Sequence, residues 1–364
     1  MTTLTQASHQ WATRPADERF LSLTDLQEHM HSVRDRSRGR VVSTRRIEAV
    51  PVENDPKGLA LLVNDEPSLA TNWSFQQVAQ RADAPASYLK KLRSDLAADC
   101  INYGLKRRNV EDVGTLIRVG DPGSPVATLA AATGPNYGRV WNADIVDALI
   151  SRFGDGRTGT FTVPGEFGKE VAITKQNTTI YGSDRDMFVF LADEKNRVEV
   201  PNRRDGKPGS LARGFFVGNS EVGSATLSVV GFLYDYVCMN RIVWGAEEIK
   251  QISIRHTSGA PDRFVEEIAP ALLAYSQSSS LNIEQAIARA QAARIDEVDD
   301  FLNDRFTRSQ AKAIKLVHEA EENRPIETLW DASTAITAYA KGIEYQDERI
   351  VFERVGGKVL SLAK

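Results

Sequence analysis

Residues 211–237, LARGFFVGNSEVGSATLSVVGFLYDYV, place a turn of small residues between two apolar runs. The first run, Leu211–Val217, combines aromatic and β-branched side chains and is typical of a strand. The second run, Thr226–Val243, fits a strand that continues into a buried helix or is replaced by one, because periodicity alone does not separate these alternatives. In the turn, Gly218–Ser224, small side chains permit a positive φ and a close approach of the backbone.

The segments on either side predict both strands and helices. Thr115–Val119 and Val126–Ala131 are predicted to be strands, and Asp121-Pro122-Gly123 between them is a turn signal. From Pro261 onward, apolar residues recur at helical spacing. We therefore predict an α+β fold with a mixed, mainly antiparallel sheet core, a helical hairpin near the N-terminus and a helical C-terminal region.

The composition predicts a folded chain with three regions. The chain has 364 residues, of which 41% are hydrophobic and 26% charged, close to globular averages. This excludes wholesale disorder. We expect an exposed basic arm over residues 1–46, an α+β core with a basic hairpin over residues 47–260, and a helical C-terminal region over residues 261–364.

The helical hairpin is predicted over Trp73–Leu96, with a break at Asp83-Ala84-Pro85. Its second helix, Ala86–Leu96, carries Lys90, Lys91 and Arg93 on the face opposite its apolar residues. Two short helices of which the second is basic have the outline of a helix-turn-helix. The turn carries proline rather than the usual glycine, so a plain helical hairpin is the favoured interpretation.

The sequence offers no known active-site motif. Loops for nucleotide phosphates, dinucleotide-binding turns, zinc-protease helices and nucleophile elbows are all missing. The two cysteines, Cys100 and Cys238, form no CxxC pair, and His29 and His31 would point to different faces of a helix. The sequence therefore favours a non-enzymatic protein without catalytic residues, cofactor or metal.

The longest apolar stretch, Leu227–Val237, is too short to cross a bilayer, so we expect a cytoplasmic protein that does not enter membranes.

Basic side chains are clustered, although the net charge of the chain is -4. Phosphate binding requires local clusters rather than a basic total, because salt screens charges beyond about 8–10 Å. The four clusters are Arg34, Arg36, Arg38, Arg40, Arg45 and Arg46; Lys90, Lys91 and Arg93; Lys106, Arg107 and Arg108; and Arg203, Arg204, Lys207 and Arg213. Each cluster taken alone is equally consistent with a solvated surface.

The turn between the two apolar runs carries one carboxylate, Glu221. It suits a general base or a cation ligand, but no second carboxylate or nucleophile accompanies it. The favoured interpretation is that Asn219 and Ser220 satisfy the bend and that Glu221 pairs with an arginine such as Arg255. Because Arg255 and His256 also suit a phosphate or carboxylate, an alternative ligand pocket would contain Asn219, Glu221, Arg255 and His256.

Six blocks of the chain occur in an order that resembles a known family. They are the helix pair around Pro85, Tyr137–Asn142, Gly218–Ser224, Val237–Asn240, Arg255–Thr257 and Thr328–Thr337. Over roughly residues 70–340 the chain resembles the uncharacterised phage/plasmid-like family, domain of unknown function 932. That family usually has asparagine near Ser333-Thr334, where this chain departs. The resemblance implies residence in mobile elements, near genes for DNA replication, recombination or defence evasion, and supplies no catalytic residues.

The leading hypothesis is a non-enzymatic protein that binds single-stranded DNA in recombination or replication and assembles as a homo-oligomer. Phosphates would contact Arg203, Arg204, Lys207, Arg213, Lys106, Arg107 and Arg108, and bases would stack on Tyr137 or Phe215. One alternative is an enzyme or ligand-binding protein that uses the pocket around Glu221, Arg255 and His256. Another is a protein-interaction factor acting against host defence, with an acidic surface that comprises Asp296, Glu297, Asp299, Asp300 and Asp304.

Overall fold

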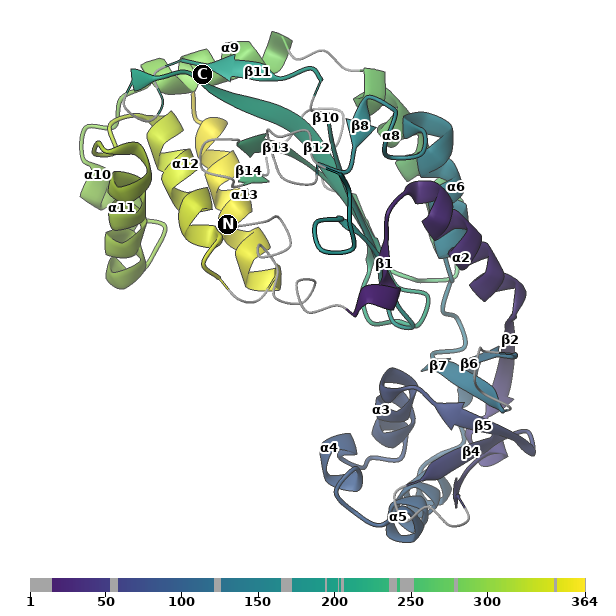
Figure 1. Ribbon diagram of the computed structural model, residues 1–364. Helices are drawn as coiled ribbons and strands as arrows, with labels where there is room; N and C mark the ends of the chain where they lie inside the picture. The colour runs from purple at the N-terminus through teal and green to yellow at the C-terminus, as the bar shows by residue number, and fades with distance from the viewer. Residues whose placement is uncertain are drawn as a thin grey trace.

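The computed structural model shows two lobes joined side by side (Figure 1). The structure describes residues 15–52, 58–120, 126–164, 172–193, 195–201, 203, 206–235, 241–242, 252–277, 281–343 and 346–363. Residues 37–134 form what we call the small lobe, and the described residues on both sides of this segment form the large lobe. The small lobe is thus an insertion between two segments of the large lobe.

A six-stranded sheet forms the base of the small lobe. Its order is β2-β6-β7-β5-β4-β3, and all neighbouring strands are antiparallel except β5 and β7. The strands are β2 (Ser37–Ser43), β3 (Ile47–Pro51), β4 (Leu59–Val63), β5 (Glu66–Ala70), β6 (Asp112–Arg118) and β7 (Ala127–Thr133). A 3-10 turn, Thr44–Arg46, connects β2 to β3.

Three helices cover one face of this sheet: α3 (Asn72–Arg81), α4 (Ala86–Leu89) and α5 (Ser94–Arg107). The hydroxyl of Thr71 accepts a hydrogen bond from the Ser74 amide and caps α3. The predicted break at Asp83–Pro85 is confirmed, and Asp83 adopts a φ of 57° there. The predicted second helix over Ala86–Leu96 is wrong, because the chain leaves the helix at Lys90 and starts a new one at Ser94.

A nine-stranded sheet forms the centre of the large lobe, and its described strand pairs are antiparallel. Its main path is β1-β9-β10-β12-β13-β14, with β8, β11 and β15 paired to β10, β12 and β13. The strands are β1 (Arg19–Phe20), β8 (Phe161–Thr162), β9 (Ile180–Gly182), β10 (Met187–Asp193), β11 (Val198–Val200), β12 (Gly209–Asn219), β13 (Leu227–Asp235), β14 (Arg241–Ile242) and β15 (Ile252–Ile254). The two apolar runs of residues 211–237 are therefore the paired strands β12 and β13, which settles the strand-or-helix alternative for Leu227–Asp235.

Two groups of helices pack on this sheet (Figure 1). The first group lies over the side chains of Val189, Leu191 and Phe215, and contains α2 (Leu23–Asp35), α6 (Asn142–Phe153) and a continuous helical stretch of α7 (Ala260–Arg263), a π-helical turn (Phe264–Ile268) and α8 (Ala269–Gln277). The second group packs on β11 and the far end of β12, and contains α9 (Leu281–Ala292), α10 (Val298–Asn303), α11 (Arg308–Glu322), α12 (Leu329–Ala340) and α13 (Gln346–Leu360). The predicted α+β class with a helical C-terminal region is confirmed.

The expected domain boundaries need correction. Residues 15–46 are not an exposed arm, because Leu23, Leu26 and Met30 of α2 are buried against the large lobe and β2 is part of the small lobe's sheet. Residues 47–260 do not share one core, since they contribute to two separate sheets. Residues 1–14 lie outside the described residues. Within the described part of the chain, no helix is both long and apolar enough to span a membrane.

Candidate nucleic-acid interface and inter-lobe cleft

The outer face of α5 combines an aromatic ring with two cations. Ala97, Ile101 and Leu105 are buried against the small lobe's sheet, and Asp99, Cys100 and Tyr103 face solvent on the opposite side of the helix. Tyr103 is 69% exposed, and Lys106 and Arg107 are exposed one turn later at positions i+3 and i+4. Side chains at these spacings are neighbours on a helix surface. The face therefore has an exposed aromatic ring beside two cations, of which Arg107 also lies 3.2 Å from Asp83.

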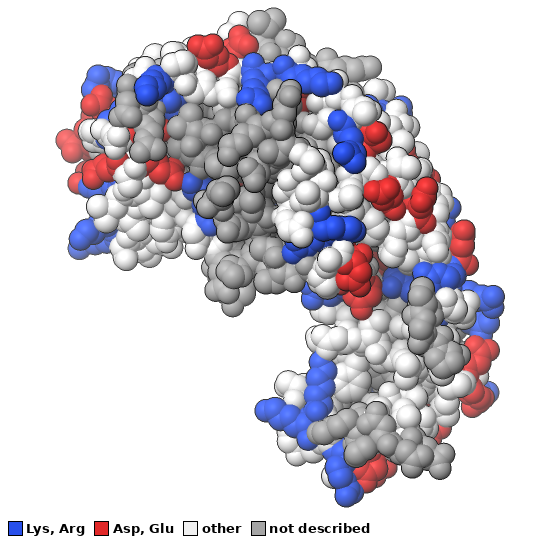
Figure 2. Space-filling view, viewed as in Figure 1, with Lys and Arg blue, Asp and Glu red and all other residues white. Residues whose placement is uncertain are grey.

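The loop between α4 and α5 extends this basic surface. Lys90, Lys91 and Arg93 are exposed there, and the ring of Tyr88 is 56% exposed. Figure 2 shows Lys and Arg side chains gathered along this margin of the small lobe. Residues 72–108 contain seven Lys or Arg against three Asp, whereas the whole chain is net negative. We call the exposed residues of α4, α5 and their loop the basic helical layer.

Three residues that the sequence assigned to nucleic acid are instead in the core. The guanidinium of Arg203 is 1% exposed, donates to Glu322 at 3.0 Å and lies over the Trp330 ring. Arg213 is paired with the buried Asp193 at 3.1 Å. Phe215 is fully buried among the side chains under α6 and α8. None of the three can reach a ligand on the surface, so these assignments are corrected.

Three further residues predicted to contact nucleic acid, Arg204, Lys207 and Tyr137, lie outside the core or outside the described residues. Lys207 is exposed, whereas Arg204 lies outside the described residues. Tyr137 is half-buried at the lobe junction, where its ring stacks on His256 at 4.8 Å and its hydroxyl donates to the Ser220 carbonyl. The ring is thus already engaged by protein groups. This weakens its predicted role as a platform for bases.

The turn Gly218–Ser224 connects the two lobes. The side chain of Val222 is buried among Leu116, Ala130 and Ala131 of the small lobe. Its carbonyl accepts hydrogen bonds from Trp73 Nε1 at 3.0 Å and Gln77 Nε2 at 2.8 Å, both on α3. Gly223 has a φ of +86°, so the turn requires a residue without a side chain at that point.

Glu221 is buried where the two lobes meet and stabilises their contact. It is 3% exposed, and one carboxylate oxygen accepts from the Asn142 amide at 2.8 Å, at the N-terminus of α6. The other oxygen lies 3.7 Å from Arg118 of β6. Burial raises the pKa of Glu221, while the Asn142 hydrogen bond and the charges of Arg118 and Arg139 act in the opposite direction. The favoured structural interpretation agrees with this geometry, although the paired arginine is Arg118 rather than Arg255.

The alternative pocket does not assemble from its four residues in the form expected. Asn219 is buried and donates to the Val140 carbonyl and to Asn142 Oδ1. Arg255 is exposed, and His256 Nδ1 bonds to the Gly138 carbonyl oxygen at 3.0 Å. Burial lowers the pKa of His256. Asn219 and Glu221 are therefore buried where they hold the lobe junction, whereas Arg255 is exposed.

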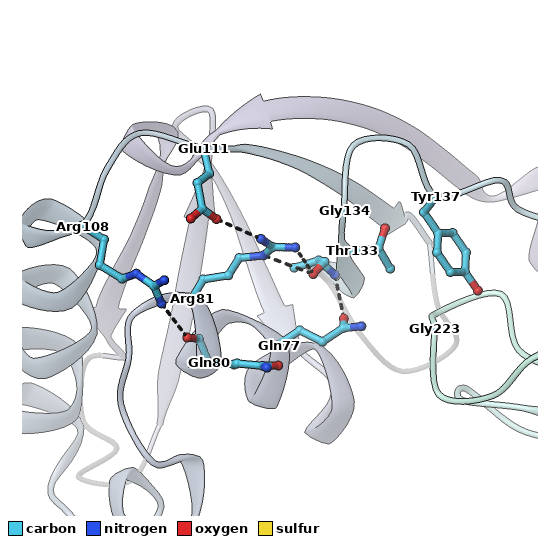
Figure 3. A pocket seen from close by; sticks show the side chains of 10 residues that line it. Gln77, Gln80, Arg81, Arg108, Glu111, Thr133, Gly134, Tyr137 and Gly223 are labelled. Atoms are coloured by element: carbon cyan, nitrogen blue, oxygen red, sulfur yellow. Dashed lines mark hydrogen bonds and ion pairs between the residues drawn. The ribbon is translucent and has the colours of Figure 1, made fainter. Parts of the chain in front are cut away.

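A cleft of about 420 Å³ opens beside this junction (Figure 3). The small lobe contributes Gln77, Gln80, Arg81, Arg108, Glu111, Ala132, Thr133 and Gly134, and the junction contributes Tyr137 and Gly223. Volumes of this size accommodate small ligands. Two guanidinium groups and one carboxylate give the cleft a positive character.

Residues 173–352 match the model of a family described as a domain of unknown function (DUF932). The predicted resemblance to the domain of unknown function 932 is confirmed over these residues, which make up just under half of the chain. The DUF932 region contains the turn Gly218–Ser224, Arg255–Thr257 and Thr328–Thr337, which carried the resemblance in the sequence. The basic helical layer lies before it. No curated protein and no solved structure matches the chain significantly.

Tyr88 and Tyr103 are the surface residues that the sequence reasoning missed. The signal was present in the spacing of Ala97, Ile101 and Leu105, which places Tyr103 opposite the buried face. Among the described residues, no group of three or more His, Cys, Asp or Glu side chains could hold a metal ion.

Proposed function

We propose that the chain binds single-stranded DNA through the basic helical layer of the small lobe, without enzymatic activity. The observation that carries the proposal is the exposed ring of Tyr103 beside Lys106 and Arg107 on one face of α5. Proteins that bind single strands combine a basic surface for the backbone with aromatic rings on which bases stack. Recombination or replication of a mobile element, with assembly as a homo-oligomer, is the cellular setting that we propose for this binding.

Single strands fit this surface better than duplex DNA. A stacking ring requires an unpaired base, and α4, with only four residues, is too short to act as a reading helix in a major groove. The contact is therefore expected to depend on charge and stacking rather than on base sequence. Lys207, on the large lobe, remains a proposed phosphate contact.

The test is fluorescence anisotropy with labelled single- and double-stranded DNA across a salt series. Lys106→Ala/Arg107→Ala removes two phosphate contacts and should make the salt dependence, the slope of log K against log salt, shallower by about 1.4, at about 0.7 per contact. Tyr103→Ala should weaken binding by about 1–3 kcal/mol at every salt concentration, because a stacked base is lost while the charge is unchanged.

The matched control is Arg308→Ala/Lys312→Ala, which removes two exposed cations from α11 of the large lobe. It changes the net charge equally but leaves the basic helical layer intact. Equal loss of affinity in the control and in Lys106→Ala/Arg107→Ala would contradict the location of the interface. Affinity that stays constant from low to high salt would contradict nucleic-acid binding through phosphates.

The alternatives have weaker structural support. Glu221, the carboxylate of the enzyme or ligand-binding hypothesis, is engaged at the lobe junction. Of the acidic surface, Asp299 pairs with Lys315, and Asp296, Glu297, Asp300 and Asp304 are exposed in and around α10. An acidic surface suits a basic protein partner but is more often only a solvated helix face.

A further inference from the structure

The inter-lobe cleft presents two arginines whose charges are not balanced within it. Arg81 extends from α3, Arg108 follows α5, and Glu111 is the only carboxylate among the residues that line the cleft. Burial lowers the pKa of Arg81, the charge of Glu111 acts in the opposite direction, and the charge of Arg108 lowers the pKa further. Two guanidinium groups facing one space attract a group that carries two negative charges.

Arg81 is held in place by the protein itself. Its Nη2 donates to the Ala132 carbonyl at 3.2 Å, and its Nη1 lies 3.5 Å from Glu111 (Figure 3). A guanidinium has five N–H groups, so N–H groups on both terminal nitrogens are left for a ligand. Its side chain is 19% exposed. A donor fixed before binding loses little conformational entropy when a ligand arrives.

Arg108 and Gln80 form the more open side of the cleft. Both side chains are exposed, and Arg108 Nη1 makes a long contact of 3.4 Å with the Gln80 carbonyl. Gln80 can therefore offer its amide donors and acceptor to a base or a sugar. Ala132, Thr133, Gly134 and Gly223 are small residues of the lining, and the cleft is open at Gly134, where a Cβ would meet no atom within 4 Å.

We propose that this cleft binds a terminal phosphomonoester attached to a nucleoside, with the phosphate between Arg81 and Arg108. A phosphomonoester carries up to two negative charges and matches the fork of a guanidinium, whereas a phosphate within a strand carries one. The ligand has two sources, a free nucleoside monophosphate or the phosphorylated end of a strand. The strand source rests on the proposed DNA binding, whereas the free-nucleotide source is independent of it.

The experiment compares ligands that differ only in the phosphate. Single strands of one sequence with a 5′-phosphate, a 3′-phosphate or hydroxyl ends are compared by anisotropy, and thymidine monophosphate is compared with thymidine by calorimetry. The phosphorylated ligand should bind about tenfold more tightly, because charge-assisted hydrogen bonds to two guanidinium groups replace contacts of a hydroxyl.

Two variants locate the preference. Arg108→Gln removes one charge and should reduce the tenfold ratio to about threefold or less, while Arg108→Lys keeps a charge without the fork and should retain an intermediate ratio. Gly134→Leu fills the cleft from a position where a Cβ meets no atom within 4 Å, so it should abolish the ratio without disturbing the fold. Arg305→Gln, outside the cleft on the large lobe, should leave the ratio at its original value.

Each outcome is informative. A phosphate preference for strands alone identifies a strand end, and one for thymidine monophosphate alone identifies a free nucleotide. A preference that survives Gly134→Leu, or no preference for any phosphorylated ligand, overturns the proposal. Failure of DNA binding in general would be seen separately, as the loss of salt-dependent affinity for hydroxyl-ended strands, and would leave the thymidine monophosphate result unaffected.

Discussion

Glu221 shows how a single residue joins the lobes. Replacing it with alanine removes the Glu221 carboxylate from Arg118, whose side chain is 8% exposed, and removes the acceptor of the Asn142 amide. Removal of one partner from a buried ion pair costs about 3–5 kcal/mol. We expect Glu221→Ala to lower the free energy of unfolding in urea by about that amount.

The control for this expectation is a double-mutant cycle with Arg118→Met. In the Glu221→Ala background, Arg118→Met should be much less destabilising than in the wild-type background, because it removes a buried charge that has already lost its partner. Strict additivity of the two single variants would contradict the coupling between Arg118 and Glu221.

For single residues, the sequence showed which side chains are charged but not which of them are buried. Arg203, Arg204, Lys207 and Arg213 form one basic cluster in sequence, but Arg203 and Arg213 are paired with Glu322 and Asp193. Glu322 lies more than a hundred residues away, so no local pattern could reveal the pair. By contrast, the bend at Asn219–Gly223 was predictable, because the Ser220 hydroxyl accepts hydrogen bonds from the amides of Val222 and Ser224 there.

At the scale of elements, local signals predicted strands and breaks better than helix boundaries. The strand β12 was predicted from its sequence, and the break at Asp83–Pro85 follows from proline chemistry. The run that forms β13 was left open between a strand and a helix, because both can use its aromatic and β-branched residues. The end of α4 at Leu89 was not predictable from spacing, since apolar residues continue through Leu92. A second helix, α5, packs on the end of α3 instead, with Gly104 against the backbone of Ala82.

The contact between α3 and α5 gives a testable prediction. A Cβ at Gly104 would lie 1.9 Å from the Ala82 carbonyl oxygen, so Gly104→Ala must push the helices apart. Alanine gains about 0.5–1 kcal/mol of helix propensity, but overpacking costs about 1–3 kcal/mol. We expect net destabilisation in urea unfolding. Gly134→Ala, which meets open space, is the control and should be neutral or slightly stabilising.

At the scale of the whole molecule, the insertion of one lobe into the other was not predictable. Residues 37–134 have their own sheet, but the chain enters them at Arg36-Ser37 without a Gly- or Pro-rich linker that would mark a boundary. Where the chain leaves them, Gly134-Pro135 and Gly138 are equally typical of an ordinary loop between a strand and a helix. The boundary is instead visible in contacts such as those of Val222 with α3. Because the cleft lies at this boundary, its residues could not be grouped from the sequence.

Three histidines distributed over the molecule make its stability depend on pH. Burial lowers the pKa of His256 at the lobe junction and His318 in α11 below the ordinary value of 6.5. The pKa of His29 in α2 is also lowered, by partial desolvation and by the charges of Arg36 and Arg118, although this residue is exposed. The unfolded chain therefore binds protons before the folded chain does as the pH falls. The contribution of these groups is fully present above pH 6.5 and is lost as the pH falls towards their folded pKa values. Glu221, whose pKa is raised, has the opposite effect.

We expect the urea concentration at the unfolding midpoint of the wild-type chain to decrease when the pH is lowered from 7.5 to 5.5. The triple variant His29→Gln/His256→Gln/His318→Gln should show a smaller decrease, even if its midpoint at pH 7.5 differs from that of the wild type. Glutamine keeps a polar side chain but binds no proton in this range, so the comparison isolates the charge. Single variants assign the effect to α2, the junction or α11. An equal decrease in the triple variant would show that other groups control the response to acid. It would also show that desolvation of these three rings does not favour their neutral form.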